Sequence, residues 1–267
     1  GLWRQFMLDF GLVTLIVCWF FYLLKSNKFQ ELKYIIPLGI IGGLGFLMKG
    51  TFFLILIGPA IYFLIQTMLY LKKEKILIFV KNITLSLFIT FLIAGPWYIK
   101  NFRKMIEFGF EHAFGKLGQP WNLGPIFSWE TLSAYWMSII NFGISSYFFG
   151  LMIISIILVV LLQKKVFSKT ALWFLATWFL PPFLIFSLIN LKEYRYMLPI
   201  FPALGIVIGA LLDSLISKKI KVQVILYSVI FLFPLFNFFY LSFDLPSNLR
   251  RDINCGSFVL FTKDLRK

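Results

Sequence analysis

The feature that most constrains this chain is a series of long apolar segments separated by short, lysine-rich connections. A helix that spans a bilayer needs about 20 mostly apolar residues, within a range of roughly 17–25. Segments that meet or approach this length cover roughly 10–24, 34–48, 52–71, 83–99, 135–162, 172–190, 197–216 and 222–241. They are continuously apolar rather than alternating, which excludes a transmembrane barrel. We therefore expect an all-α polytopic membrane helix bundle with about eight transmembrane helices.

Composition excludes the main soluble classes. Of the 267 residues 60% are apolar and only 14% are charged, and the mean hydropathy is +0.87. A soluble domain is usually about one quarter charged, and a disordered chain needs low hydrophobicity. The net charge of +15 would suggest nucleic acid in a soluble protein. Here cationic loops that orient a membrane protein explain it better, so we expect membrane lipids and no nucleic acid as partners.

The distribution of basic residues predicts an orientation. Alternate connections are short and dense in lysine, which is typical of cytoplasmic loops; they cover 25–33, 72–82, 163–171 and 217–221. We expect a multi-pass protein of the inner (plasma) membrane. All six arginines fall on the other side, with the single His112; they are Arg4, Arg103, Arg195, Arg250, Arg251 and Arg266. Arginine grips phosphate with two parallel hydrogen bonds, so the extracytoplasmic face is where we expect anion chemistry, unless the bias arose by chance.

We expect two regions along the chain. Residues 1–241 form the bundle, with an outer loop at 100–134 in which 102–114 suit a short amphipathic helix on the membrane. Residues 242–267 form a non-cytoplasmic polar tail that could begin a further segment. The chain starts at Gly1 without a signal-peptide pattern, and we expect it to lack an N-terminal part.

Two short stretches mark helix ends on the outer side. GLGFLMKG at 43–50 allows close helix approach through its glycines and then presents Lys49, either as a phosphate contact or as an ordinary boundary lysine. In GPWYIKN at 95–101, Pro96 ends or kinks the helix. Trp97 and Tyr98 follow it, and they suit either a substrate groove or a plain aromatic belt.

The stretch KEYRYMLPIFPALG at 192–205 is the most informative one. Lys192 and Arg195 are three residues apart and share one side of a helical turn. With Tyr196 they suit the phosphate or pyrophosphate of a lipid head group, although a tight turn with boundary charges is the alternative. The prolines that follow predict an irregular entry to the next helix, and irregular backbone at this depth is tolerated where it lines a cavity.

Asp9, in RQFMLDFGLV, is the candidate catalytic carboxylate. It could act as a base, as a metal ligand, or simply as a helix-start carboxylate favoured by the helix dipole. No cysteine and histidine cluster could bind zinc, and the glycine-rich and nucleophile motifs of soluble enzymes are missing.

Taken in their order along the chain, RQFMLDFGLV, GLGFLMKG, GPWYIKN and KEYRYMLPIFPAL resemble the membrane glycosyltransferases of the GT-C fold. The similarity is to glycosyltransferase family 39, which includes protein O-mannosyltransferases and the lipid A aminoarabinose transferase, and it spans roughly residues 4–205. The resemblance implies transfer of a sugar from a polyprenyl-phosphate carrier to a lipid, protein or glycan acceptor on the periplasmic face. It implies that the main catalytic acid lies in a first outer loop absent here, so this chain alone would be inactive.

Residue roles follow from the same resemblance. Asp9 matches a later aspartate of the family, Lys49 the polar residue at the glycine-rich helix end, and Lys192, Arg195 and Tyr196 the basic stretch that contacts carrier phosphate. No cofactor is certain, and a divalent metal is left open. Two alternatives remain: a polysaccharide ligase or polymerase that works through His112 and Arg103, and a flippase or transporter of lipid-linked sugars.

Overall fold

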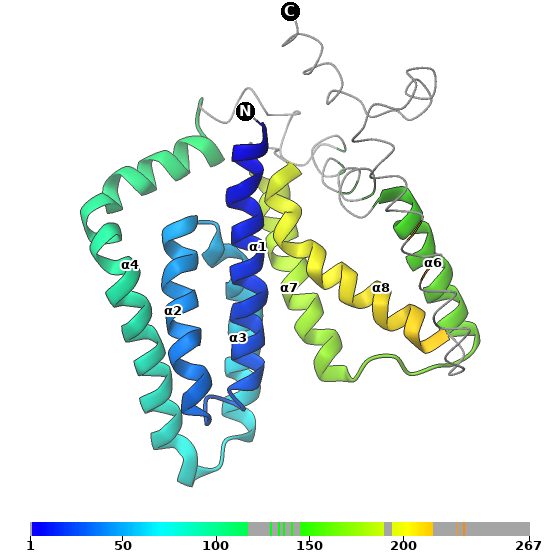
Figure 1. The fold of residues 1–267 in the computed structure, drawn as a ribbon, viewed down its shortest axis with the longest axis horizontal. Helices are drawn as coiled ribbons and strands as arrows, with labels where there is room; N and C mark the ends of the chain where they lie inside the picture. The colour runs from blue at the N-terminus through cyan, green and yellow to red at the C-terminus, as the bar shows by residue number, and fades with distance from the viewer. Residues whose placement is uncertain are drawn as a thin grey trace, which may run out of the picture. The chain divides into compact units, whose positions relative to one another are not determined.

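The computed structural model describes residues 2–116, 145–189 and 194–215, together with residues 129, 133, 136, 140, 228 and 232. Within these ranges the chain is helical and contains no strand. Its elements are α1 (Leu2–Lys25), α2 (Leu32–Met48), α3 (Phe52–Tyr70), the 3-10 helix η1 (Lys73–Lys75), α4 (Ile76–Ala113), α6 (Ser145–Leu161), α7 (Lys169–Leu188), the 3-10 helix η4 (Tyr194–Ile200) and α8 (Phe201–Leu215) (Figure 1). The all-α prediction is thus confirmed for the described chain.

Four stretches of the described helices are long and apolar enough to cross a membrane: Phe52–Tyr70, Lys73–Ala113, Lys169–Leu188 and Arg195–Leu215. Leu32–Met48 and Tyr147–Leu161 are shorter apolar helices. The segment expected at 222–241 lies outside the described residues, apart from Ser228 and Leu232. The structure therefore supports a membrane-embedded helical protein, with four candidate spans among the described residues by length and composition.

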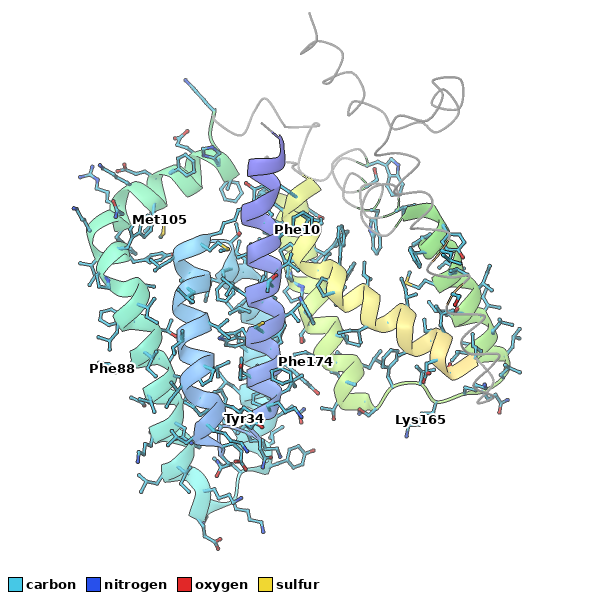
Figure 2. All side chains as sticks on the ribbon, viewed as in Figure 1. Phe10, Tyr34, Phe88, Met105, Lys165 and Phe174 are labelled. Carbon is cyan, nitrogen blue, oxygen red and sulfur yellow. The ribbon has the colours of Figure 1, made fainter. Side chains whose placement is uncertain are left out.

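These helices expose many large apolar side chains, which would be unfavourable in contact with water. Phe88 lies on the side of α4 away from α2 (Figure 2). Leu87, Phe88 and Leu92 of α4 are exposed, and near the start of the helix Leu77 is 79% exposed. A continuous apolar face of this kind marks contact with lipid or another apolar partner. It is what a helix needs when hydrocarbon, not water, surrounds it.

Small residues bring α2 and α4 together. A Cβ added at Gly39 would lie 2.8 Å from the carbonyl oxygen of Ser86, and one added at Gly43 would lie 2.6 Å from Cβ of Ile93. The Thr90 hydroxyl donates to the Gly39 carbonyl at 2.9 Å. Glycines four apart that admit a neighbouring backbone are a recurrent packing device in membranes, where burial of apolar surface does not drive association.

A second contact surface joins α1, α3, α7 and η4. Leu12, Ile16 and Phe20 recur at every fourth position of α1 and are buried. Phe20 meets the ring of Trp178 on α7 edge-on, with ring centroids 4.5 Å apart. Gly58 of α3 lies directly against the backbone of α7. These contacts hold α1 and α3 against α7.

Pro96 does not end its helix. α4 runs for 38 residues through Pro96 to Ala113, and it bends along its length (Figure 1). The outer loop expected from residue 100 is therefore helical in its first part, and the short helix expected at 102–114 is the last part of α4. By contrast, the predicted irregular entry near Pro199 is confirmed, because η4 is a 3-10 helix that precedes α8.

The chain divides into two compact units, Gly1–Ser214 and Leu215–Lys267. The first unit holds all the elements above except the last residue of α8. The boundary expected at 241 lies outside the described residues. The sites discussed below belong to the first unit.

Candidate functional site at the start of α1

A buried ion pair links α1 to the end of α2. The Lys49 ammonium donates to Oδ1 of Asp9 at 2.6 Å. The Asp9 side chain is only 3% exposed and that of Lys49 is 25% exposed. A charge taken from water is costly unless it is paired, so each side chain requires the other in this position.

The local sequence explains how Lys49 reaches Asp9. α2 ends at Met48, and Lys49 has extended backbone with its N–H donating to the Gly45 carbonyl. Gly45 lacks a side chain where the ring of Phe52 packs, so the chain can turn back tightly into α3. On the facing helix, Gly11 leaves room for the side chain of Met48. The close approach of α1 and α2 thus brings the two charges together.

Tyr196 of η4 completes this group. The Lys49 ammonium lies 4.6 Å from the centroid of the Tyr196 ring, a cation–π contact. The ring stacks in turn on Phe186 of α7, with centroids 5.2 Å apart and an interplanar angle of 14°. We refer to Asp9, Lys49 and Tyr196 as the Asp9 cluster. It joins three segments that are far apart in the sequence.

The position of η4 is itself well fixed. The Trp178 indole N–H donates to the Pro199 carbonyl at 3.0 Å. Met197 and Ile200 are fully buried. A 3-10 turn leaves backbone groups that a side chain must satisfy, and Trp178 satisfies one of them. Tyr196 therefore projects from a rigid turn.

The structure describes three of the four remaining predicted site residues. The Tyr98 hydroxyl donates to the Phe46 carbonyl at 2.9 Å, so Tyr98 holds the end of α2 just before Lys49. Trp97 is 49% exposed and its ring contacts only its neighbour in the rings described, Tyr98. Arg195 is half-buried in η4, next to Tyr196, and has an interaction partner. Lys192 lies outside the described residues.

One interpretation of Asp9 changes with this geometry. Asp9 is the eighth residue of α1, about two turns from its start. The interpretation of Asp9 as a carboxylate at the helix start, favoured by the helix dipole, is therefore wrong. Among the residues that the structure describes, no group of three His, Cys, Asp or Glu side chains could hold a metal ion. Lys49 supplies the positive charge that Asp9 faces, and the pair as a whole is neutral.

The residues of the rival ligase interpretation lie elsewhere, on the exposed end of α4. Arg103 pairs with Glu107 one helical turn away at 2.8 Å, and both side chains are largely exposed. A ring nitrogen of His112, Nδ1, lies 2.9 Å from the Phe108 carbonyl of the same helix. These contacts are local to α4 and do not involve the Asp9 cluster.

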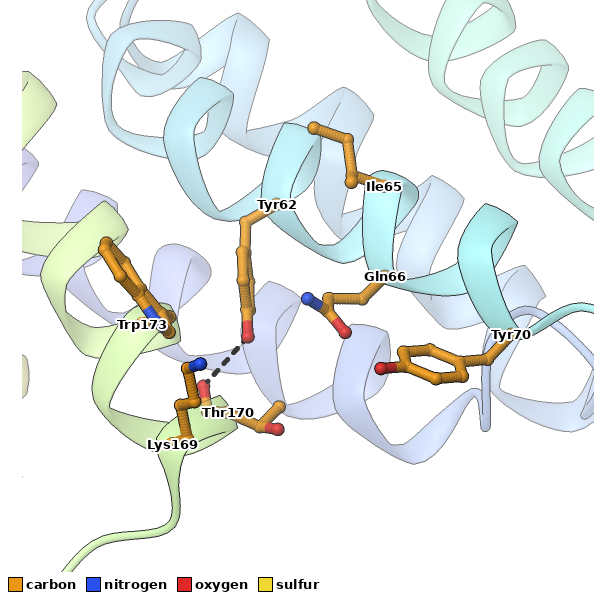
Figure 3. A pocket seen from close by; sticks show the side chains of 7 residues that line it. All are labelled: Tyr62, Ile65, Gln66, Tyr70, Lys169, Thr170 and Trp173. Atoms are coloured by element: carbon orange, nitrogen blue, oxygen red, sulfur yellow. Dashed lines mark hydrogen bonds between the residues drawn. The ribbon is translucent and has the colours of Figure 1, made fainter.

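Sequence reasoning missed an open pocket of about 410 Å³ between the last turns of α3 and the first turn of α7. It is lined by Tyr62, Ile65, Gln66, Tyr70, Lys169, Thr170 and Trp173 (Figure 3). The available signal was the four-residue spacing of Tyr62, Gln66 and Tyr70 within an apolar helix, which places three polar side chains on one face. Their partner α7 could not be inferred from that spacing.

No protein-family model, curated protein or solved structure matches the chain.

Proposed function

We propose that this protein is an integral-membrane glycosyltransferase of the GT-C type that moves a sugar from a polyprenyl-phosphate carrier to a lipid, protein or glycan acceptor. The observation that carries this proposal is the Asp9 cluster. Asp9, Lys49 and Tyr196 come from three stretches that are far apart in the sequence. That they meet at one end of the first unit supports a common site.

The frame that we propose has about eight transmembrane helices, of which four are among the described residues. The lysine-rich connections lie on the cytoplasmic side, and the Asp9 cluster lies at the extracytoplasmic boundary. Two contacts support this arrangement. Asp9 and Lys49 meet at one end of the helices, and Lys28 and Tyr70 meet at the opposite end.

In the reaction, the acceptor oxygen bonds to the anomeric carbon as the bond from that carbon to the phosphate oxygen breaks, with inversion. A carboxylate takes the acceptor proton. Arg195 and Lys192 neutralise the charge that grows on the leaving phosphate. Lys49, already paired with Asp9, positions Tyr196 and the start of η4 and so keeps Arg195 in place.

The test compares the wild-type full-length protein with its Arg195→Ala variant, each in native membranes. The probe is a polyprenyl-phosphate sugar with labelled sugar, and the measurement is release of free polyprenyl phosphate. We expect Arg195→Ala to lose at least about a hundredfold in rate, as for other groups that stabilise developing charge. Arg103→Ala is the matched control, since it removes an arginine whose described partner is Glu107.

Two outcomes would contradict the proposal. Wild-type rates in Arg195→Ala would remove Arg195 from the phosphate site. A loss in Arg103→Ala and His112→Ala, with Arg195→Ala unaffected, would favour the ligase or polymerase interpretation. The rates of all these variants are measured in the same type of membrane preparation.

The buried Asp9–Lys49 pair favours one second candidate, a flippase or transporter of lipid-linked sugars, because ionisable residues within a membrane bundle often mark transport pathways. In that case the labelled lipid would cross the bilayer with its sugar–phosphate bond intact. Measuring accessibility of the label on both faces of sealed vesicles separates this from transfer.

A further inference from the structure

The pocket between α3 and α7 gathers hydrogen-bond donors on one side of two apolar helices. Tyr62, Gln66 and Tyr70 lie on a common face of α3 and extend toward the first turn of α7 (Figure 3). The Tyr62 hydroxyl already donates to the Thr170 carbonyl at 3.3 Å, which joins the two walls. The Gln66 amide and the Tyr70 hydroxyl face the same space as the Lys169 ammonium.

The pocket carries positive charge without a carboxylate. Lys169 is the first residue of α7 and lines the pocket, and no acidic residue is among the described lining side chains. A second ammonium, that of Lys28, lies 4.9 Å from the centroid of the Tyr70 ring. Phenolic, amide and ammonium donors arranged around one space suit the oxygens of a phosphate group.

The backbone that presents Lys28 is held in an unusual conformation. Asn27, Lys28 and Phe29 have backbone φ values of 47°, 60° and 61°, which residues other than glycine rarely adopt. Phe29 is buried between Phe63 and Phe79, and its carbonyl accepts a hydrogen bond from the Asn82 amide at 2.6 Å. The surrounding structure therefore enforces this turn, and such enforced strain is concentrated at functional positions.

The location of the pocket favours the phosphate of a lipid head group over a free phosphate anion. α3 ends at Tyr70 and α7 begins at Lys169, and both helices are candidate membrane spans. Their ends therefore lie where head groups begin. Ile65 and Trp173, which also line the pocket, are about half exposed and offer apolar surface beside the polar donors. A free anion would not use that apolar rim, whereas a lipid would lay its acyl chains along it.

We propose that this pocket binds the phosphate head group of an anionic glycerophospholipid, with Lys169 and Lys28 as its charged contacts and Tyr62, Gln66 and Tyr70 as its neutral donors. The site lies on the lysine-rich end of the first unit, away from the Asp9 cluster. It is independent of the proposed transfer reaction. Basic pockets between helices on the cytoplasmic side are where such head groups bind in membrane proteins.

The experiment measures lipids that stay bound to the full chain in micelles, by native mass spectrometry, with equal amounts of phosphatidylglycerol and phosphatidylcholine. We expect wild type to retain phosphatidylglycerol preferentially. Lys169→Gln should reduce that preference about fivefold, the effect of one lysine near an anionic surface. Lys28→Gln should act in the same direction. Lys165→Gln is the matched control, because Lys165 is an exposed lysine of the same connection that does not line the pocket.

Three results would overturn the proposal. Equal retention of the two lipids by wild type would show that the pocket does not select an anionic head group. An equal loss in Lys165→Gln would show general surface charge instead of a site. Displacement of phosphatidylglycerol by millimolar inorganic phosphate would assign the pocket to a free anion. Tyr70→Phe, which removes one hydroxyl and keeps the ring beneath Lys28, gives a second variant should Lys169→Gln fail to fold.

Discussion

The Asp9–Lys49 pair gives a prediction whose size can be worked out from the geometry. Two unit charges 2.6 Å apart attract by about 6 kcal/mol at the effective dielectric constant of about 20 that fits protein data. Most of this attraction offsets the cost of taking both charges out of water. The net value of the pair is therefore modest, but the loss of one partner is expensive because the other remains buried.

The two single variants should differ. Lys49→Met leaves the Asp9 carboxylate, which is 3% exposed, without its described cation, and we expect it to cost about 4 kcal/mol of unfolding free energy. Asp9→Asn leaves an ammonium that is 25% exposed and can turn partly toward water, so about 2 kcal/mol is expected. The double variant Asp9→Asn/Lys49→Met should cost about 3 kcal/mol, which implies a coupling of about 3 kcal/mol between the two residues.

The measurement is equilibrium unfolding in mixed micelles, read for the wild type, both single variants and the double variant. Arg103 and Glu107 provide a matched control cycle, since they form an ion pair of similar length, 2.8 Å, that is exposed. Their coupling should be no more than about 0.5 kcal/mol. If the costs of Asp9→Asn and Lys49→Met simply add, the buried pair does not hold α1 to the end of α2 and the reasoning is refuted.

Two further predictions concern the contacts that support the site. Gly43→Leu should destabilise the protein by at least about 3 kcal/mol in the same unfolding measurement, because its Cβ would meet Ile93 at 2.6 Å; Gly209→Leu, where a Cβ meets nothing within 4 Å, should be nearly neutral, and equal effects would contradict the packing argument. Asn82→Ala should cost about 1–2 kcal/mol by removing the donor to the Phe29 carbonyl, and faster hydrogen exchange around residue 29 should accompany it; unchanged exchange there would disconnect Asn82 from the strained turn.

The sequence predicted helices well where a single physical cause decides them. Continuous apolar segments of membrane-spanning length could only be helical, since a helix satisfies its own backbone in hydrocarbon. Of the two outcomes expected at Pro96, an end or a kink of the helix, the end is wrong: α4 continues through Pro96 and is bent. In a membrane bundle, neighbouring helices and local adjustments can satisfy the backbone groups that proline leaves free, and sequence pattern does not reveal these neighbours.

The candidate site was predictable as residues but not as contacts. The glycines of GLGFLMKG indicated that Lys49 would stand at a close helix approach, and that is where it lies. Its partner is 40 positions away, and the depth of Asp9 in α1 depends on how far the helix extends before it. Neither property leaves a periodic signal. The same limit applies to Tyr62 and Thr170, which are 108 positions apart.

Each end of the first unit is fixed by a contact that carries a free-energy cost: desolvation of charges at one end and backbone strain at the other. At one end a buried ion pair joins α1 to the end of α2, and at the other Asn82 holds a left-handed turn that connects the same two helices. Between them, glycines let α2 approach α4 closely. Since hydrocarbon does not drive helices together, polar contacts at the ends and close packing in between must set the register. A shift of α2 along α1 would therefore separate Lys49 from Asp9 and move Lys28 relative to Tyr70, so the Asp9 cluster and the lipid pocket depend on the same helix position.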